Sequence, residues 1–213
     1  RDLLAPHGPQ VQCRMITALD EPNDVVDVYG RFVGDILVTI NGQETNLNHW
    51  LVEQGWAFPA FYSSMSKQEI TKFLQLSTPV RARKDGVWKN WKKQNKIGVL
   101  NQKLIYRGKG TRPDPQEEKG PVIRPKLFRR ASMWKINQMA KMVTGGLGKY
   151  LTTYPDDCYL TSQFLVSPHT AAHRKLHEFY RSDGTFGLRP DELVFQEKEA
   201  ALVGPNGKPV TDW

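Results

Sequence analysis

The chain has 213 residues and a hydrophobic content of 39%, which fits one or two soluble domains. No apolar run approaches the length that spans a bilayer, and no secretory signal pattern opens the chain. We therefore expect a cytoplasmic protein or a component of a nucleoprotein particle. The two cysteines, Cys13 and Cys158, are far apart, which argues against a disulfide framework and favours a reducing compartment.

The formal net charge of +8 is spread unevenly. Residues 1–66 hold 3 Lys and Arg against 8 Asp and Glu, whereas residues 67–130 hold 18 against 5, a net charge of +13. Residues 131–213 hold 9 of each kind. A basic block this concentrated indicates a polyanionic partner, most often nucleic acid. The alternative, which the sequence leaves open, is a solvated basic linker.

The N-terminal part alternates β-like and helical patterns. Residues 1–4 resemble the last turn of a helix, which a stretch rich in Pro and Gly closes. Residues 11–17 alternate as a half-buried strand does. Residues 32–40 are rich in β-branched and aromatic side chains and predict a second strand, which ends at Asn41-Gly42 in a tight turn.

Two helices are expected next. Asn46 or Asn48 caps a short helix that ends at Gly55 in the left-handed conformation. Ser66 and Glu69 form a capping box at the start of a longer helix.

This longer helix carries an internal proline. Pro79 is expected to kink the helix or to restart it with Thr78 as a fresh cap, because proline lacks the N–H that the helix needs. Gly86 is expected to close the segment.

The rest of the chain is predicted to be mostly helical. Residues 107–125 are rich in Gly, Pro and charge and predict an extended linker or arm. Residues 127–143 have helical periodicity, with Gly145-Gly146 as the stop. A further helix is expected at residues 169–181, and one short strand at residues 193–195.

The stretch Asp27-Val28-Tyr29-Gly30-Arg31 places an arginine where a turn meets a strand. The planar guanidinium of Arg31 matches two phosphate oxygens at once, so this position suits a phosphate clamp. The alternative is that Arg31 forms a surface ion pair with a carboxylate.

Three short motifs resemble, in order, those of the staphylococcal nuclease (thermonuclease-like) family. They are the D-x-Y-G-R stretch at residues 27–31, the helix pattern at residues 47–57, and Ala82-Arg83-Lys84-Asp85-Gly86-Val87-Trp88, which resembles the family's helix end. The resemblance covers about residues 1–91, less than half of the chain.

The resemblance implies an α+β fold with a five-stranded oligonucleotide-binding barrel and packed helices. The family's first three strands are not found in this sequence, so we expect a partial barrel that a cleaved N-terminal part or another chain completes. The expected organisation is an incomplete nuclease-like domain at residues 1–98, a basic linker or arm at 99–126, and a helical C-terminal extension at 127–213.

The same resemblance implies a catalytic role for one residue. In the family, two arginines clamp the phosphate, a glutamate acts on the attacking water, and two aspartates hold Ca²⁺; the cations neutralise charge that develops on phosphorus. Arg31 matches the second arginine. Ca²⁺ is implied as a cofactor, but its ligands match nothing in this chain.

Further residues are candidates for binding nucleic acid. Tyr29 and Phe61 match aromatic residues of the family's nucleotide pocket, although Phe61 can equally plug the barrel end. Cations interleaved with Trp88 and Trp91 can track a phosphate backbone, or they can merely decorate the barrel. These cations are Arg81, Arg83, Lys84, Lys89, Lys92, Lys93 and Lys96.

His169, His173 and His177 would share one face of the helix expected at residues 169–181. Pairs of histidines four residues apart can bind Zn²⁺. The sequence supplies few further ligands nearby, so a polar helix face is the favoured interpretation and no metal site is assigned.

Two functions remain in competition. One is a nuclease that hydrolyses DNA or RNA, which the D-x-Y-G-R stretch favours. The other is a non-catalytic nucleic-acid-binding or structural component of a larger nucleoprotein assembly such as a virus particle, which the unmatched catalytic residues and the C-terminal half favour.

Overall fold

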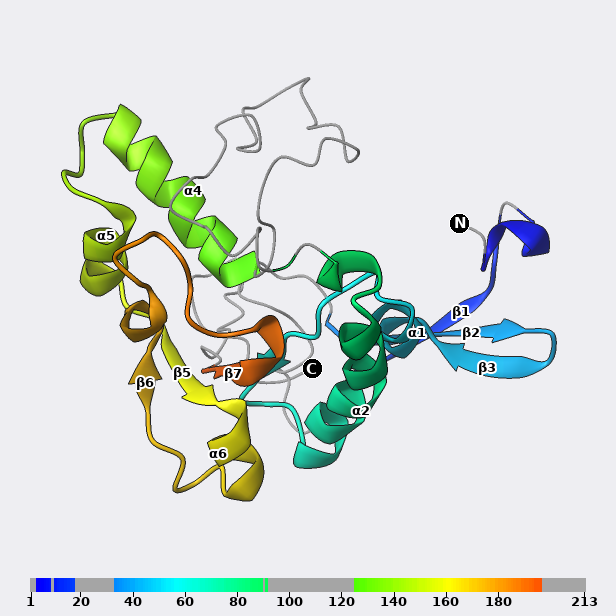
Figure 1. Cartoon of the computed structure of the whole chain (residues 1–213). Helices are drawn as coiled ribbons and strands as arrows, with labels where there is room; N and C mark the ends of the chain where they lie inside the picture. The colour runs from blue at the N-terminus through cyan, green and yellow to red at the C-terminus, as the bar shows by residue number, and fades with distance from the viewer. Residues whose placement is uncertain (1–2, 9, 18–32, 90, 92–124, 197–213) are drawn as a thin grey trace, which may run out of the picture. The chain divides into compact units, whose positions relative to one another are not determined.

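A computed structural model describes residues 3–8, 10–17, 33–89, 91 and 125–196 (Figure 1). The chain divides into two compact units: unit 1 comprises Arg1–Ala57 and Glu197–Trp213, and unit 2 comprises Phe58–Gln196. The linker expected at residues 99–126 lies almost entirely outside the described residues, so the predicted domain division stays a prediction.

Unit 1 contains a three-stranded antiparallel sheet with the order β1-β2-β3. Its strands are β1 (Cys13–Ile16), β2 (Asp35–Ile40) and β3 (Gln43–Asn46). The expected turn between β2 and β3 is confirmed: Asn41 and Gly42 both have positive φ angles, 51° and 77°, as a two-residue hairpin turn requires. The strand β3 was not predicted. The buried apolar residues of strand β2 are Leu37 and Val38.

The first turn of unit 1 differs from the prediction. The 3₁₀ helix η1 (Ala5–His7) forms within the stretch that was expected to break a helix. His7 N–H donates to the carbonyl of Leu4 at 3.0 Å. The first two residues of the turn expected at residues 1–4 lie outside the described residues.

Helix α1 (Leu47–Glu53) confirms the expected short helix and decides its cap. The side-chain oxygen of Asn46 accepts hydrogen bonds from the backbone N–H groups of Asn48 (2.9 Å) and His49 (3.1 Å). Asn48 instead donates to Asp35 Oδ1 at 2.7 Å and fixes the start of the helix against β2. Gly55 has a φ of 69°, as the prediction required.

Unit 2 is built around a four-stranded sheet with the order β4-β7-β5-β6. Strand β4 runs parallel to β7, and the other pairs are antiparallel. Helices surround this sheet in Figure 1. The elements in chain order are β4 (Phe61–Tyr62), α2 (Lys67–Arg83), η3 (Gly86–Trp88), α4 (Pro125–Met139), α5 (Leu147–Thr153), β5 (Asp157–Leu160), α6 (Thr161–Val166), β6 (Arg174–Lys175), η6 (Leu176–Phe179), η7 (Pro190–Glu192) and β7 (Leu193–Phe195).

The prediction of an α+β fold is confirmed, but the prediction that residues 127–213 are helical apart from one short strand is not. The described part of that region contributes β5, β6 and β7 to the sheet. Strand β7 confirms the strand expected at residues 193–195. The strands β5 and β6 have four and two residues, too few for a reliable alternation of apolar and polar side chains.

The helix expected at residues 169–181 is wrong. Arg174 and Lys175 form β6, which pairs with β5 through Cys158↔Arg174 and Asp157↔Lys175. Leu176 N–H then donates to the carbonyl of Asp156 at 2.9 Å. Strand pairing and the burial of Leu176 therefore override the local helical pattern.

Of the two outcomes expected at Pro79, a kink or a restart, the restart of helix α2 is wrong. The helix runs without a break from Lys67 to Arg83. The hydroxyl of Thr78 donates to the carbonyl of Leu74 within the helix at 2.7 Å, so Thr78 is not a cap. The helix ends at Lys84, which has a positive φ of 59°, two residues before Gly86.

Helix α4 confirms the helix expected at residues 127–143, with earlier bounds. Lys141 has a positive φ of 57°, and Met142 N–H donates to the carbonyl of Asn137 at 2.9 Å. This closure is a Schellman motif in which a lysine occupies the position that usually holds glycine.

Candidate nucleic-acid interface

Helix α2 carries the first group of candidate cations at its C-terminal end. Its start is fixed as expected: the hydroxyl of Ser66 accepts a hydrogen bond from Glu69 N–H at 3.1 Å. Ile70, Phe73 and Val80 are buried on one face. This packing fixes the rotation of the helix and therefore decides which of the cations near residue 83 face solvent.

Arg81 lies on the packed side of this helix. Its guanidinium forms an ion pair with Asp191, whose side chain is only 1% exposed and also accepts from Arg189 Nε at 3.0 Å. The guanidinium also lies 5.8 Å from the ring centre of Trp88. Burial, and then the charge of Arg189, lower the pKa of Arg81. The contacts of Arg81 are thus those of an interior clamp, and a contact with phosphate would compete with Asp191.

Arg83, Lys84 and Lys89 are exposed. Arg83 pairs with Asp85 at 2.7 Å, but both side chains are at least half exposed and such a pair contributes little. Lys84 stands at the left-handed C-cap of α2, where the negative end of the helix dipole favours a cation. All three cations are thus open to solvent.

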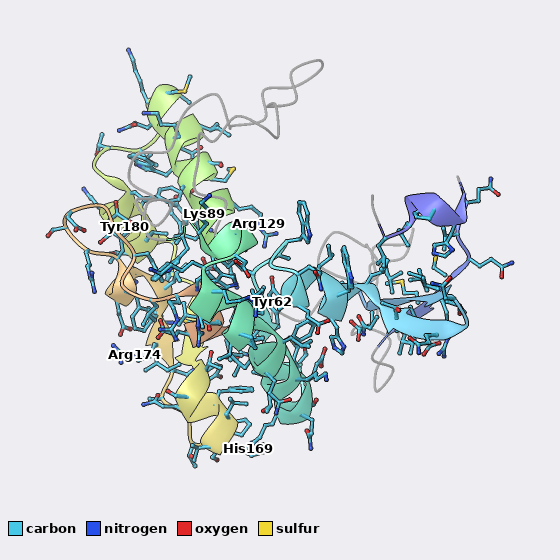
Figure 2. The ribbon with its side chains drawn as sticks, turned by 45° about the vertical axis from the view of Figure 1, so that its right-hand side comes forward. Tyr62, Lys89, Arg129, His169, Arg174 and Tyr180 are labelled. Carbon is cyan, nitrogen blue, oxygen red and sulfur yellow. The ribbon has the colours of Figure 1, made fainter. Side chains whose placement is uncertain are left out.

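Arg129 extends this basic surface on to another helix. Lys89 directly follows η3, and Arg129 is an exposed residue near the start of α4. Figure 2 shows the labelled residues Lys89 and Arg129 next to each other in that view. The sequence prediction did not single out Arg129, because its proximity to Lys89 depends on the fold. The interface cations are hereafter Arg83, Lys84, Lys89 and Arg129.

The candidate aromatic residues in unit 2 are buried. Phe61 has no exposed surface and pairs with Val194 between β4 and β7. Trp88 is 1% exposed and meets the ring of Phe58 edge-on, with 4.7 Å between ring centres. Both rings occupy packing positions, which agrees with the alternative that the sequence left open for Phe61.

The remaining candidates lie outside the described residues. They are Tyr29, Arg31, Lys92, Lys93 and Lys96.

The carboxylates described in the strands of unit 1 are engaged with other side chains. Asp35 accepts hydrogen bonds from the side-chain amides of Asn46 (2.8 Å) and Asn48 (2.7 Å). Glu44 accepts from Arg14 at 2.7 Å. Among the residues that the structure describes, no group of three or more His, Cys, Asp or Glu side chains could hold a metal ion. The described donors therefore do not fit the Ca²⁺ that the resemblance implies.

The three histidines do not share a helix face. His173 lies just before β6, and His177 lies in η6. The Nε2 atom of His173 is 3.1 Å from the hydroxyl of Tyr159, which donates to Gln196 Oε1 at 2.6 Å. The geometric basis for a zinc site on these residues is therefore absent.

A second buried carboxylate holds α4 to the sheet. Asp156 is 1% exposed and accepts both hydrogen bonds of the Arg130 guanidinium, at 2.7 and 2.9 Å. Lys126 Nζ lies 3.7 Å from the same carboxylate. This arrangement positions the start of α4, and with it Arg129.

These features define an α+β region with exposed cations at and after the end of α2. Residues 10–90 match the family model described as Staphylococcal nuclease homologue, and the resemblance seen in the sequence is thereby confirmed for this part of the chain. The match covers well under half of the 213 residues. The comparisons with curated proteins and with solved structures give no match. No helix among the described residues is long and apolar enough to cross a membrane.

Proposed function

We propose that this protein binds a sugar-phosphate chain, with the interface cations and Arg31 as its phosphate contacts. The observation that carries the proposal is the family match over residues 10–90, which includes Arg31 in the D-x-Y-G-R stretch. The exposure of Arg83, Lys84 and Lys89 within the matched region supports it. Basic side chains bind phosphates by releasing condensed counterions, a mechanism that needs no base specificity.

Within this proposal, hydrolysis of DNA or RNA is the activity that the family implies. Arg31 would neutralise charge on the phosphorane, and hydrolysis further needs a carboxylate that orients water and a metal site. Asp35 and Glu44 are held by Asn46, Asn48 and Arg14, and neither is assigned these roles. The barrel of the family, completed by a further segment or chain, would supply them.

The second candidate is a binding component of a nucleoprotein assembly without catalysis. Among the described strand carboxylates of unit 1, Asp35 favours it, because Asp35 already accepts hydrogen bonds from the side-chain amides of Asn46 and Asn48. A nuclease assay on the whole protein with and without Ca²⁺, beside Arg31→Ala, separates the two. Cleavage that Arg31→Ala abolishes supports the enzyme, and binding without cleavage supports the assembly component.

The binding proposal itself is tested by the salt dependence of affinity. Removing one cation that binds a phosphate should reduce the slope of log K against log salt by about 0.7–0.9. Replacing Arg83, Lys84 and Lys89 together by Gln should therefore reduce the slope by about 2–3 for a single-stranded or duplex oligonucleotide.

Lys72→Gln is the matched control, because Lys72 is exposed on the same helix about three turns earlier. A triple variant with the slope of the unaltered protein would refute the assignment of these three cations to phosphate binding.

A further inference from the structure

Among the described residues, Trp56 has the most exposed aromatic side chain, at 69%, and Tyr154 follows at 43%. The ring of Tyr154 already packs against that of Tyr150, with 4.6 Å between the ring centres. For the indole of Trp56, no contact with another aromatic ring or with a cation is found within the described part of the chain. The indole of Trp56 is therefore open to a partner from solvent.

The backbone at Trp56 is fixed by the C-terminal end of α1. Trp56 N–H donates to the carbonyl of Leu51 at 2.8 Å, and Gly55 N–H donates to the carbonyl of Val52 at 3.1 Å. These two hydrogen bonds form a Schellman motif, with Gly55 in the left-handed conformation at a φ of 69°. Because Trp56 belongs to this hydrogen-bonded helix end, little backbone freedom is lost when a ligand binds to its ring.

The helix end alone does not explain why a tryptophan stands at this position. A Schellman motif is often accompanied by one apolar contact between the two positions that Trp56 and Leu51 occupy here. An aliphatic side chain is sufficient for such a contact. The side chain of Trp56 nevertheless keeps 69% of its surface exposed, and Leu51 is still 39% exposed. Most of the indole surface is therefore not used by the helix end.

We propose that the indole of Trp56 stacks on an unpaired base of a single-stranded nucleic acid. This inference rests on the proposed function, which supplies a ligand with flat bases along its sugar-phosphate chain, and it narrows that ligand to a single strand. Trp56 lies within the residues 10–90 that match the family model. Stacking uses the face of one aromatic ring and tolerates any base. The bases of a duplex are already stacked on one another, so they leave no face for the indole.

The other residues of this turn disfavour a membrane or a protein as the partner. The hydrogen bond from Trp56 to Leu51 encloses Glu53 and Gln54 in the same turn, and both are exposed. An exposed carboxylate is poorly suited to an anionic lipid surface, which favours a broad apolar face with cations beside it. A protein partner needs an interface of about 1,000 Å², but the exposed apolar side chains of this turn are Trp56 and Leu51 alone. A base needs only one ring face.

Binding of the whole chain to three probes tests this assignment. The probes are an oligothymidylate, a duplex, and an abasic oligonucleotide of the same length, which keeps the phosphates but has no bases. Trp56→Leu removes the ring but keeps an apolar side chain at the helix end, and Trp56→Phe keeps an aromatic face. Tyr154→Leu is the matched control, because Tyr154 is also exposed but already packs against Tyr150.

We expect Trp56→Leu to weaken binding of the oligothymidylate by about 5- to 150-fold, which corresponds to the loss of one stacked base. Its affinity for the abasic oligonucleotide and for the duplex should equal that of the unaltered protein, and its slope of log K against log salt should be unchanged with all three probes. Trp56→Phe should keep most of the affinity, and Tyr154→Leu should lose none.

Two results would overturn the stacking proposal alone. In the first, Trp56→Leu binds the oligothymidylate as tightly as the unaltered protein does. In the second, Trp56→Leu loses affinity for all three probes to the same extent, which would indicate damage to the fold or to phosphate binding. If the unaltered protein instead binds the abasic oligonucleotide and the duplex without salt dependence, the proposed function itself is refuted, and the stacking proposal with it.

Discussion

The buried carboxylate of Asp191 gives the sharpest prediction about the interior of unit 2. Its side chain is 1% exposed. The carboxylate forms one ion pair with Arg81 of α2 and a second, at 3.0 Å, with Arg189, the residue just before η7. Replacing Asp191 by Asn keeps the shape of the side chain but removes its charge. Two guanidinium groups would then face an uncharged amide, with their mutual repulsion no longer offset.

The expected magnitude follows from the exposure of the two arginines. Breaking a fully buried ion pair costs about 3–5 kcal/mol. The side chains of Arg81 and Arg189 are 26% and 35% exposed, so each can recover part of its hydration. We therefore expect Asp191→Asn to lower the free energy of unfolding by about 2–3 kcal/mol.

Urea unfolding of the full chain measures this cost, and a double-mutant cycle assigns it. Arg81→Gln alone should also destabilise the protein, and the double variant should lose less than the sum of the single variants, with a coupling of about 1–2 kcal/mol. The salt slope of nucleic-acid binding should stay unchanged in Arg81→Gln. A cost of Asp191→Asn below about 1 kcal/mol, or strictly additive effects, would refute the view of Arg81 as an interior clamp.

Two further predictions concern helix ends and pH. Lys84→Gly should raise the free energy of unfolding by about 0.5–1 kcal/mol, because glycine adopts a φ of 59° without strain. The same variant should reduce the slope of log K against log salt for nucleic-acid binding by about the contribution of one phosphate contact. Urea unfolding of this variant should show a gain in stability, and nucleic-acid titrations at several salt concentrations should show a smaller salt slope. Hydrogen bonds from the backbone of Lys175 and then from Arg174 lower the pKa of Glu178. Glu178 therefore stabilises the fold above its ordinary pKa of about 4.3 and loses this effect in acid, so Glu178→Gln should destabilise at pH 7 and match the unaltered protein at low pH.

Local hydrogen bonds explain which parts of the fold the sequence predicts well. The caps at Asn46 and Ser66 and the turn at Asn41-Gly42 depend on partners within three residues, so a short stretch of sequence contains all that they need. Strand β4 has only two residues and depends on Val194 and Phe195, more than a hundred positions away. No local pattern indicates such a pairing.

The candidate site divides in the same way. The exposure of Arg83, Lys84 and Lys89 follows from their place at and after the end of a well-predicted helix. Arg81 was grouped with these cations because sequence spacing does not reveal a carboxylate 110 positions later that neutralises it. The prediction that the histidines at residues 169–177 share one helix face was wrong for a related reason. Arg174 and Lys175 pair with β5 as a strand, so the helix on which that prediction depended does not form.

The end of the family match has a structural consequence for unit 2. The match stops at residue 90, but its last part is bonded to residues beyond it. Ser63 N–H donates to the carbonyl of Phe195, and Lys67 Nζ donates to the carbonyl of Val166, each at 2.9 Å. Arg81 relies on Asp191 in the same way. A chain cut after residue 98 would lose these partners and expose Phe61, so the nuclease-like region requires residues 125–196 to present its cations, and binding measured on such a fragment would not represent the protein.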